Sequence, residues 1–220
     1  MPTDDLAARL DRATHDRRLL DHPFYRAWVA GSLTQADLAF YATQYWRQVE
    51  AFPGFLESLA GRLNGRASAI VTDNLFDERD GDHPGLWRSF AAALGVEDVG
   101  ATAPEPETER CVGDFAAVTA SASPSFALGM IYGYESQTPE VAATKVAGLR
   151  EHYGIDGPGI AYFEIHGELD VAHARGLAEA IAAVADDDEA LADAEAGARA
   201  GAEAIYGLLD GVARVRNISC

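Results

Sequence analysis

The segment from Tyr162 to His173 carries the residues best suited to chemistry. It reads Tyr-Phe-Glu-Ile-His-Gly-Glu-Leu-Asp-Val-Ala-His, so His166, Asp170 and His173 are spaced at i, i+4 and i+7. At 3.6 residues per turn, these three side chains fall within an arc of about 60° on one helix face. Two imidazoles and a carboxylate on one face are half of a transition-metal site. The spacing therefore predicts a metal-binding helix.

A complete metal site needs ligands from other segments, and three further residues are candidates. Glu78 and His83 flank a short acidic turn, and Glu135 ends a strongly apolar run. A carboxylate at the end of such a run is costly to bury unless it is paired or bound to a metal. The six candidates supply three imidazoles and three carboxylates. This mixed set of nitrogen and oxygen ligands favours iron or manganese over zinc.

A structural interpretation of these three residues competes with the metal interpretation. His83 precedes Pro84 and would then only start a helix. Glu78 lies in a row of acids and would be solvated, and Glu135 would pair with an arginine.

The composition is typical of a soluble globular protein. Of 220 residues, 48% are hydrophobic, and the formal net charge is −18. No apolar run is long enough to span a bilayer, and the acidic N-terminal segment lacks the layout of a signal peptide. We therefore expect a cytoplasmic protein. We expect neither a nucleic-acid nor a membrane partner, because both surfaces are anionic and would repel the chain.

The usage of lysine and cysteine is unusual. Lys145 is the only lysine in the chain, and nearly all other basic residues are arginine. A lysine that persists against such a bias is a candidate for amine chemistry, which a guanidinium does not perform. The two cysteines, Cys111 and Cys220, match no zinc or redox spacing.

Helical periodicity dominates the chain, and no segment alternates like a strand. Thr34 and Asp37 form a variant of the capping box at the start of a long helix, which Pro53 is expected to kink. Residues 97–106 are expected to form a loop. The pattern predicts one all-α bundle of about eight to ten helices over residues 1–220. The expected helices cover 3–20, 23–31, 34–63, 66–79, 83–95, 107–121, 124–137 with a kink or restart at Pro139, 159–183 and 188–209.

Several motifs, spread over nearly the whole chain, are together typical of a known family. They are His22-Pro-Phe-Tyr25-Arg-Ala-Trp28, Ala51-Phe-Pro53, Asp73-Asn-Leu-Phe-Asp-Glu78, His83-Pro-Gly-Leu-Trp87, Tyr134-Glu-Ser-Gln-Thr-Pro139, Lys145, and Tyr162 to His173. On these motifs the chain resembles the CADD-like branch of the haem-oxygenase-like dimetal oxygenases. The TENA-type thiaminases and the cofactorless pyrroloquinoline-quinone synthase are similar at a greater distance. The resemblance implies a single-domain haem-oxygenase-like helical bundle.

The resemblance implies a centre of two divalent metals, either Fe/Fe or Fe/Mn, that reacts with O2 and an external reductant. It also implies a homodimer. The turn between Glu78 and His83 looks shorter than in the chlamydial relatives, so Asp80 and Asp82 are alternatives to Glu78. The implied metal ligands are Glu78, His83, Glu135, His166, Asp170 and His173.

For CADD-like proteins the implied activity is the formation of para-aminobenzoate for folate biosynthesis. The ring comes from a tyrosine of the protein and the amine from an internal lysine. Tyr25 matches the ring source and Lys145 the amine donor, while Tyr134 and Tyr162 match other tyrosines that line the site. The alternative role for each tyrosine is core packing, with its hydroxyl on a nearby acceptor.

Three other functions stay open. The first is a multi-turnover dimetal oxygenase that acts on a small external amino acid or fatty acid. The second is a non-catalytic protein-binding module, because the family takes its name from association with death domains. The third is a thiaminase-like or cofactorless enzyme. Thiaminase chemistry needs a positioned cysteine nucleophile, and neither Cys111 nor Cys220 lies in a suitable motif.

Overall fold

The computed structural model describes residues 3–219, and every regular element within them is a helix. The all-α prediction and the expected number of helices are therefore confirmed. Cys220 lies outside the described residues. Three short 3-10 turns are η1 (His15–Arg17), η2 (Leu19–Asp21) and η3 (Gly157–Gly159). The α-helices of residues 3–219 are α1 (Thr3–Thr14), α2 (Pro23–Val29), α3 (Gln35–Ala60), α4 (Gly65–Asp80), α5 (His83–Ala93), α6 (Pro106–Ser121), α7 (Pro124–Glu135), α8 (Thr138–His152), α9 (Ala161–Val184) and α10 (Asp188–Arg216).

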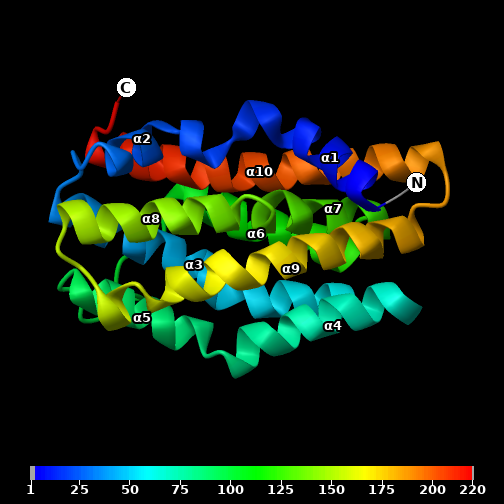
Figure 1. The fold of residues 1–220 in the computed structure, drawn as a ribbon, viewed down its shortest axis with the longest axis horizontal. Helices are drawn as coiled ribbons and strands as arrows, with labels where there is room; N and C mark the ends of the chain where they lie inside the picture. The colour runs from blue at the N-terminus through cyan, green and yellow to red at the C-terminus, as the bar shows by residue number, and fades with distance from the viewer. Residues whose placement is uncertain (1–2, 220) are drawn as a thin grey trace.

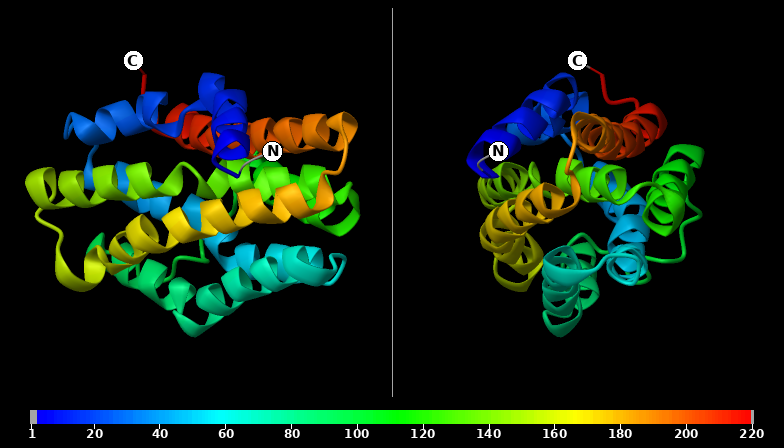
Figure 2. Two further views of the ribbon diagram at one scale, coloured as in Figure 1. Left: turned by 45° about the vertical axis from the view of Figure 1, so that its right-hand side comes forward. Right: turned by 90° about the vertical axis from the view of Figure 1, so that its right-hand side faces the viewer.

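Most of the helices run broadly along the long axis of the molecule (Figure 1). In that view α1, α2 and α10 lie along the top, and α4 and α5 lie along the bottom, with the remaining helices between them; Figure 2 turns the same bundle. Helix α9 packs against α4, α7 and α8. The helix with the i, i+4, i+7 pattern therefore lies beside the helices that carry Glu78 and Glu135.

Local capping explains where several helices begin. Thr34 and Asp37 form the predicted capping box at α3, with each side chain bound to the other's backbone N–H. His22 caps α2, because its Nδ1 accepts a hydrogen bond from the N–H of Phe24 at 3.0 Å. Asp187 likewise accepts from the N–H of Ala190 and starts α10. Pro139 restarts the chain as α8 rather than kinking α7.

Two predicted helix ends were wrong. The first helix ends at Thr14 instead of continuing to residue 20. The Thr14 hydroxyl donates to the carbonyl of Asp11, and two 3-10 turns follow. The last helix continues past residue 209 to Arg216, because its apolar face stays buried through Leu209 and Val212. Asn217, in the left-handed conformation with φ 55°, ends it.

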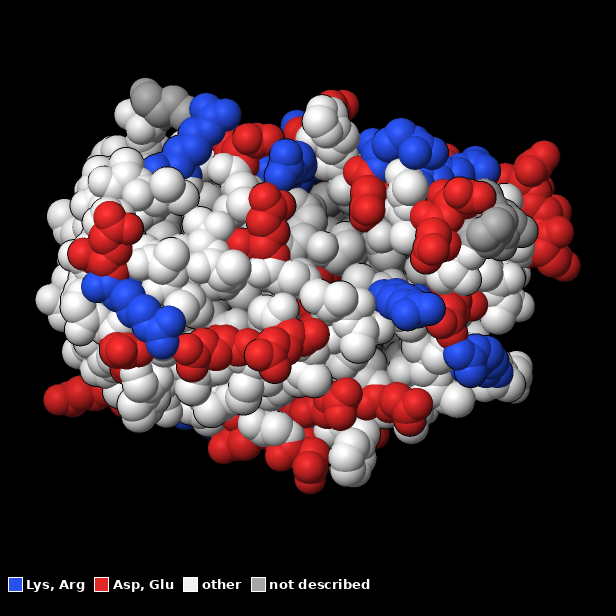
Figure 3. All heavy atoms as spheres, viewed as in Figure 1, with Lys and Arg blue, Asp and Glu red and all other residues white. Residues whose placement is uncertain are grey.

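The surface reflects the acidic composition. Figure 3 shows one face, on which acidic side chains predominate over the lower half, where α4, α5 and α9 lie. Basic side chains on this face gather near α1, with acidic groups beside them. Within residues 3–219, no helix combines the length and the apolar character that a membrane span needs.

Helices α7 and α10 approach each other so closely that only glycine fits at the contact. A Cβ at Gly133 would lie 2.0 Å from the carbonyl oxygen of Ala198, and one at Gly201 would lie 2.1 Å from that of Met130. This pairing was not predicted from the sequence, although both helices carry glycines four residues apart. The contact holds α7, and so Glu135 at its last residue, against the C-terminal helix.

Gly201→Ala is expected to destabilise the protein by about 1–3 kcal/mol, because overpacking forces the two helices apart. Gly207 is the matched control on the same helix, since an added Cβ there meets no neighbouring atom within 4 Å among the described residues. Gly207→Ala should be neutral or stabilise by up to about 1 kcal/mol through helix propensity. Urea unfolding measures both variants, and equal stabilities would contradict the close contact.

Candidate metal centre

The six predicted ligands come together in the structure as two buried groups of three. Within each group, one candidate ligand atom per residue lies within 4.8 Å of the other two. All six side chains belong to residues that are at most 8% exposed. We call Glu78, His83 and His166 the first triad, and Glu135, Asp170 and His173 the second triad.

The turn between α4 and α5 brings His83 back to Glu78. Asp82 has φ 46°, and its carboxylate accepts a hydrogen bond from the N–H of Gly85, which starts α5. A Cβ at Gly81 would lie 2.6 Å from Nε2 of His83, so glycine is required for the ring to fold over the turn. As a result, Nδ1 of His83 lies 2.9 Å from Oε2 of Glu78.

The ring nitrogens of the first triad are arranged to face a cation. Nδ1–H of His166 donates to the carbonyl of Tyr162 at 2.6 Å, which leaves Nε2 directed at Oε1 of Glu78, 3.7 Å away. The ring nitrogens of His83 form no well-aligned hydrogen bond, although the residue is 1% exposed and Nδ1 lies close to Oε2 of Glu78. A buried ring nitrogen held against a carboxylate without good hydrogen-bond geometry is suited to share a metal ion with it.

The protonation state of Glu78 also suits a metal ligand. Burial acts to raise its pKa, but the adjacent imidazoles of His166 and His83 outweigh burial and hold the pKa at about 2. Glu78 therefore stays a carboxylate at neutral pH. Asp80 and Asp82, the alternatives considered for this position, are exposed, and Asp82 caps α5. The structure thus brings Glu78, not its neighbours, into the triad.

The second triad joins the end of α7 to the middle of α9. Both carboxylate oxygens of Glu135 accept from Nδ2 of Asn74, at 2.9 and 3.0 Å. Glu135 therefore pairs with an asparagine and not with an arginine. Burial, and then the nearby Asp170, raise the pKa of Glu135 to about 8. Two crowded carboxylates favour a bound cation, which would relieve their repulsion.

His173 completes the second triad. Its Nδ1 lies 3.1 Å from Oδ1 of Asp170, and its Nε2 lies 3.1 Å from Oδ2 of Asp77. Burial lowers its pKa, but the hydrogen bond to Asp170 and the charge of Glu135 outweigh burial and raise the pKa to about 9. Metal binding at this imidazole therefore has to displace a proton.

The predicted tyrosines and the lysine line one internal cavity. Tyr25, Tyr134, Tyr162 and Lys145 surround a space of only about 10 Å³, which His166 of the first triad also lines. Tyr162 stacks on His166 with ring centroids 4.0 Å apart. The structure therefore brings all four residues to one side of the first triad.

The amine of Lys145 is buried among aromatic rings. It lies 4.8 Å from the ring centroid of Phe163 and 5.4 Å from that of Tyr25. Its Nζ donates a hydrogen bond to the hydroxyl of Tyr41 at 2.7 Å. Burial lowers the pKa of Lys145 to about 7, so a large fraction of the amine is neutral near physiological pH.

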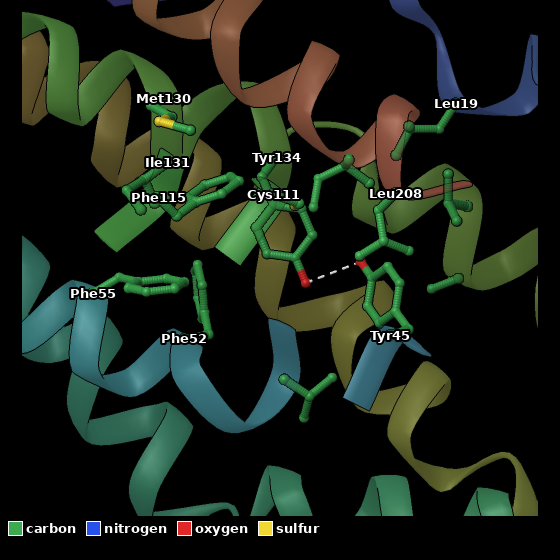
Figure 4. Close-up of a cluster of buried hydrophobic side chains, with 14 of the residues drawn as sticks. Leu19, Tyr45, Phe52, Phe55, Cys111, Phe115, Met130, Ile131, Tyr134 and Leu208 are labelled. Carbon is green, nitrogen blue, oxygen red and sulfur yellow. Dashed lines mark hydrogen bonds between the residues drawn. The ribbon is translucent and has the colours of Figure 1, made fainter. Parts of the chain in front are cut away.

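Two tyrosines of α3 that hydrogen-bond to the predicted site residues were not predicted from the sequence. Tyr41 links the two residues implied as amine donor and ring source, because it accepts from Lys145 and its own hydroxyl hydrogen-bonds to Tyr25. The hydroxyl of Tyr45 bonds to that of Tyr134 at 3.2 Å (Figure 4). Their i, i+4 spacing on a long helix was the available signal, but it equally fits core packing. Asn74 and Asp77 were also missed, since neither stands in a recognisable ligand spacing.

Comparison with known proteins identifies the family of this chain. Residues 39–206 match the family model described as "Iron-containing redox enzyme". The chain belongs to this family of iron-containing redox enzymes. The 4-aminobenzoate synthase of Nitrosomonas europaea is 34% identical over 229 residues, which cover 96% of this chain and 92% of that protein. The 4-aminobenzoate synthase of Chlamydia muridarum is 35% identical over 209 residues, with 92% and 87% covered.

Solved structures show the fold of this iron-containing redox enzyme. A TenA homologue from Pseudomonas syringae matches with a TM-score of 0.83 and 18% identity, covering 97% of this chain and 96% of the other. A domain with a haem-oxygenase-like fold from Shewanella denitrificans matches at 0.77 and 21%, covering 97% and 91%. A CADD-like protein of unknown function from Nostoc punctiforme matches at 0.75 and 20%, covering 96% and 100%. The predicted haem-oxygenase-like fold and the CADD-like resemblance are confirmed.

Lys145→Met is expected to stabilise the protein at neutral pH, because it removes a buried amine whose charged form is disfavoured. The pKa of Lys145 is about 7 in the folded chain against 10.5 ordinarily, so the folded state binds fewer protons between these values. Wild-type stability should therefore rise with pH across this window. The advantage of the variant, on the order of a few kcal/mol below pH 7, should vanish near pH 10.5.

Chemical denaturation at a series of pH values, with a chelator present, measures this difference. Lys145→Arg is the contrasting variant, because a guanidinium stays charged and should destabilise the fold at every pH. A difference between Lys145→Met and wild type that does not change with pH would contradict the lowered pKa.

Proposed function

We propose that this iron-containing redox enzyme is a 4-aminobenzoate synthase that uses its own Tyr25 as the ring source and Lys145 as the amine donor. The observation that carries the proposal is which side chains line the small cavity beside the first triad. Tyrosines and the only lysine of the chain line this cavity, whose volume is about 10 Å³. Sites for external small molecules have volumes of roughly 300–1,000 Å³. The function named for the curated relatives agrees with this proposal.

The skeleton of a tyrosine side chain fits the proposed product. A 4-aminobenzoate has a carboxyl carbon on the ring, para to a nitrogen. Tyr25 has its Cβ para to the phenolic oxygen, so oxidation by O2 would turn Cβ into the carboxyl carbon, and Nζ of Lys145 would replace the phenolic oxygen, which leaves as water. Release of the product then breaks the bond between Cα and Cβ of Tyr25 and the bond between Cε and Nζ of Lys145. One chain contains one Tyr25, so it would yield at most one product molecule.

The two triads have the donor set for the metals that this chemistry needs. The first triad would hold one ion and the second triad the other, as Fe/Fe or Fe/Mn, since imidazole and carboxylate ligands suit both. The fit rests on the buried ring of His83, whose nitrogens form no well-aligned hydrogen bond, and on the crowded carboxylates of Glu135 and Asp170. When bound, the metals would supply the activation of O2 with electrons from an external reductant.

Residues of this chain would orient the internal substrate. Tyr25 is 1% exposed, and its hydroxyl is held by Tyr41, which in turn accepts from Lys145. The pKa of Lys145, lowered to about 7, makes its lone pair available as a nucleophile near the ring of Tyr25. Tyr134 and Tyr162 wall the same cavity and exclude water from it.

The other functions considered from the sequence have less support. Cys111 is a poor nucleophile, because burial raises the pKa of its thiol, and it does not line the cavity beside the first triad. A thiaminase-like reaction is therefore disfavoured. Membership of a redox enzyme family favours catalysis over a role as a binding module alone. The small cavity disfavours an external substrate.

Tyr25→Phe is expected to abolish product formation, because the ring lacks the para oxygen at which nitrogen enters. The measurement is 4-aminobenzoate released per chain after aerobic reaction with iron, manganese and a reductant. Tyr206→Phe on α10 is the matched control and should react like wild type. Undiminished product from Tyr25→Phe would contradict the internal ring source. Many product molecules per chain, accelerated by an added substrate, would support the multi-turnover oxygenase instead.

The single lysine makes the nitrogen source directly testable. Protein produced with lysine carrying ¹⁵N at Nζ has one labelled side-chain amine, that of Lys145. Mass spectrometry of the released 4-aminobenzoate should find the label in its amino group. Unlabelled product would show that the amine enters from outside the chain, and Lys145→Met would then retain activity.

A further inference from the structure

Helix α4 holds the second triad through two residues that belong to neither triad. Asp77 immediately precedes Glu78 of the first triad, and Asn74 lies one turn earlier. Their side chains nevertheless contact the second triad. Oδ2 of Asp77 lies 3.1 Å from Nε2 of His173, and Nδ2 of Asn74 donates to both oxygens of Glu135.

The two nitrogens of His173 have different surroundings. Nδ1 lies 3.1 Å from Asp170, a member of the same triad, so it faces the space where a cation would bind. Nε2 lies against Asp77, outside the triad. A carboxylate at Nε2 selects the tautomer with its proton there, and the lone pair of Nδ1 is then directed into the triad.

The orientation of Glu135 depends on Asn74 in a similar way. Asn74 is 3% exposed, and its amide N–H groups hold both carboxylate oxygens, at 2.9 and 3.0 Å. Its own Oδ1 is buried without a hydrogen-bond partner. A buried acceptor left open beside the second triad is suited to a water molecule bound to a metal there.

Among residues 3–219, no side chain outside the triads hydrogen-bonds to a ring nitrogen of the first triad. The outer nitrogen of His166 donates to the backbone carbonyl of Tyr162, four residues earlier on α9. That contact is part of the helix itself. The orientation of His166 therefore follows from the backbone of its own helix, whereas that of His173 depends on a side chain of a different helix.

A surface cleft reaches these outer contacts. Its volume is about 240 Å³, and it lies between α4 and α9, where Asp73, Asn74, Asp77 and His173 line it. The side chain of Asp77 is 44% exposed, while that of His173 is 7% exposed. Asp77 therefore separates the second triad from solvent and can be replaced without opening the apolar core.

We propose that Asp77 and Asn74 are positioning residues that set the metal affinity of the second triad and leave that of the first triad unchanged. This inference rests on the proposed dimetal function. Loss of a partner that orients a ligand lowers metal affinity by about 10–100-fold in metalloproteins. Within the described residues, the side-chain contacts of Asp77 and Asn74 with triad members go to His173 and Glu135 of the second triad, so the loss should fall on one metal of the two.

The test is an anaerobic titration of the full chain with Mn²⁺ alone, with free Mn²⁺ followed by electron paramagnetic resonance. Wild type should bind two Mn²⁺ per chain. Asp77→Ala should keep one tight Mn²⁺ and bind the other at least about tenfold more weakly. Asp77→Asn, whose amide oxygen can still accept from Nε2–H, should bind the second ion more tightly than Asp77→Ala does.

Asp73→Ala is the matched control, because Asp73 lines the same cleft and its loss removes the same charge. It should bind both ions like wild type. Asn74→Leu is a second variant with the same expected selective loss. Wild-type affinities in Asp77→Ala, an equal loss at both sites, or the same weakening in Asp73→Ala would each overturn the positioning role. A wild type that binds fewer than two ions would overturn the proposed dimetal centre itself.

Discussion

Burial of six ionisable side chains among packed helices is the constraint on which the rest of this structure depends. An isolated charge in an apolar interior is costly, so each group needs a partner of opposite charge or a hydrogen bond. Glu78 meets this need between two imidazoles. Glu135 and Asp170 meet it less completely, because they crowd around one imidazole and only Glu135 accepts from the amide of Asn74. This crowding of carboxylates is what makes the second triad suited to a cation.

The surrounding helices are shaped to allow that burial. The α4–α5 turn has glycine at position 81, where any larger residue would displace the ring of His83. The glycine contact between α7 and α10 sets the position of the helix that ends at Glu135. Helix α9 packs against both α4 and α7. The three candidate ligands on one face of α9 therefore lie beside Glu78 of α4 and Glu135 of α7. The steric fit of the α4–α5 turn and of the α7–α10 contact thus decides whether the candidate ligands converge.

The aromatic side of the centre has a different electrostatic character. Lys145 lies among aromatic rings, which favour its neutral form through burial. The hydroxyls of Tyr41 and Tyr25 continue a buried chain of hydrogen bonds from that amine, and Tyr25 lines the same cavity as His166 of the first triad. An amine and phenols that are kept dry beside potential metal ligands are an unusual content for a protein core. Their arrangement is the physical basis for treating the chain as its own substrate.

Much of the fold and of the candidate centre was predictable from the sequence. His166, Asp170 and His173 lie on one helix, so their convergence follows from helical geometry alone. The capping box of Thr34 and Asp37 likewise predicted the start of a long helix from local hydrogen bonding. The end of the first helix was not predictable, because Thr14 bonds to its own backbone in competition with the helix. The end of the last helix depended on burial that local pattern does not reveal.

The sequence by itself therefore determined the helices, their caps and one ligand face, because these depend on residues within a few positions of each other. Only the tertiary structure decided how the six candidate ligands divide into two triads. It also decided that Glu78, rather than Asp80 or Asp82, belongs to the first triad. It also decided that Tyr41 links Lys145 to Tyr25, and that Asn74 and Asp77 hold the second triad. These contacts join helices distant in sequence, and no local spacing encodes which faces pack together.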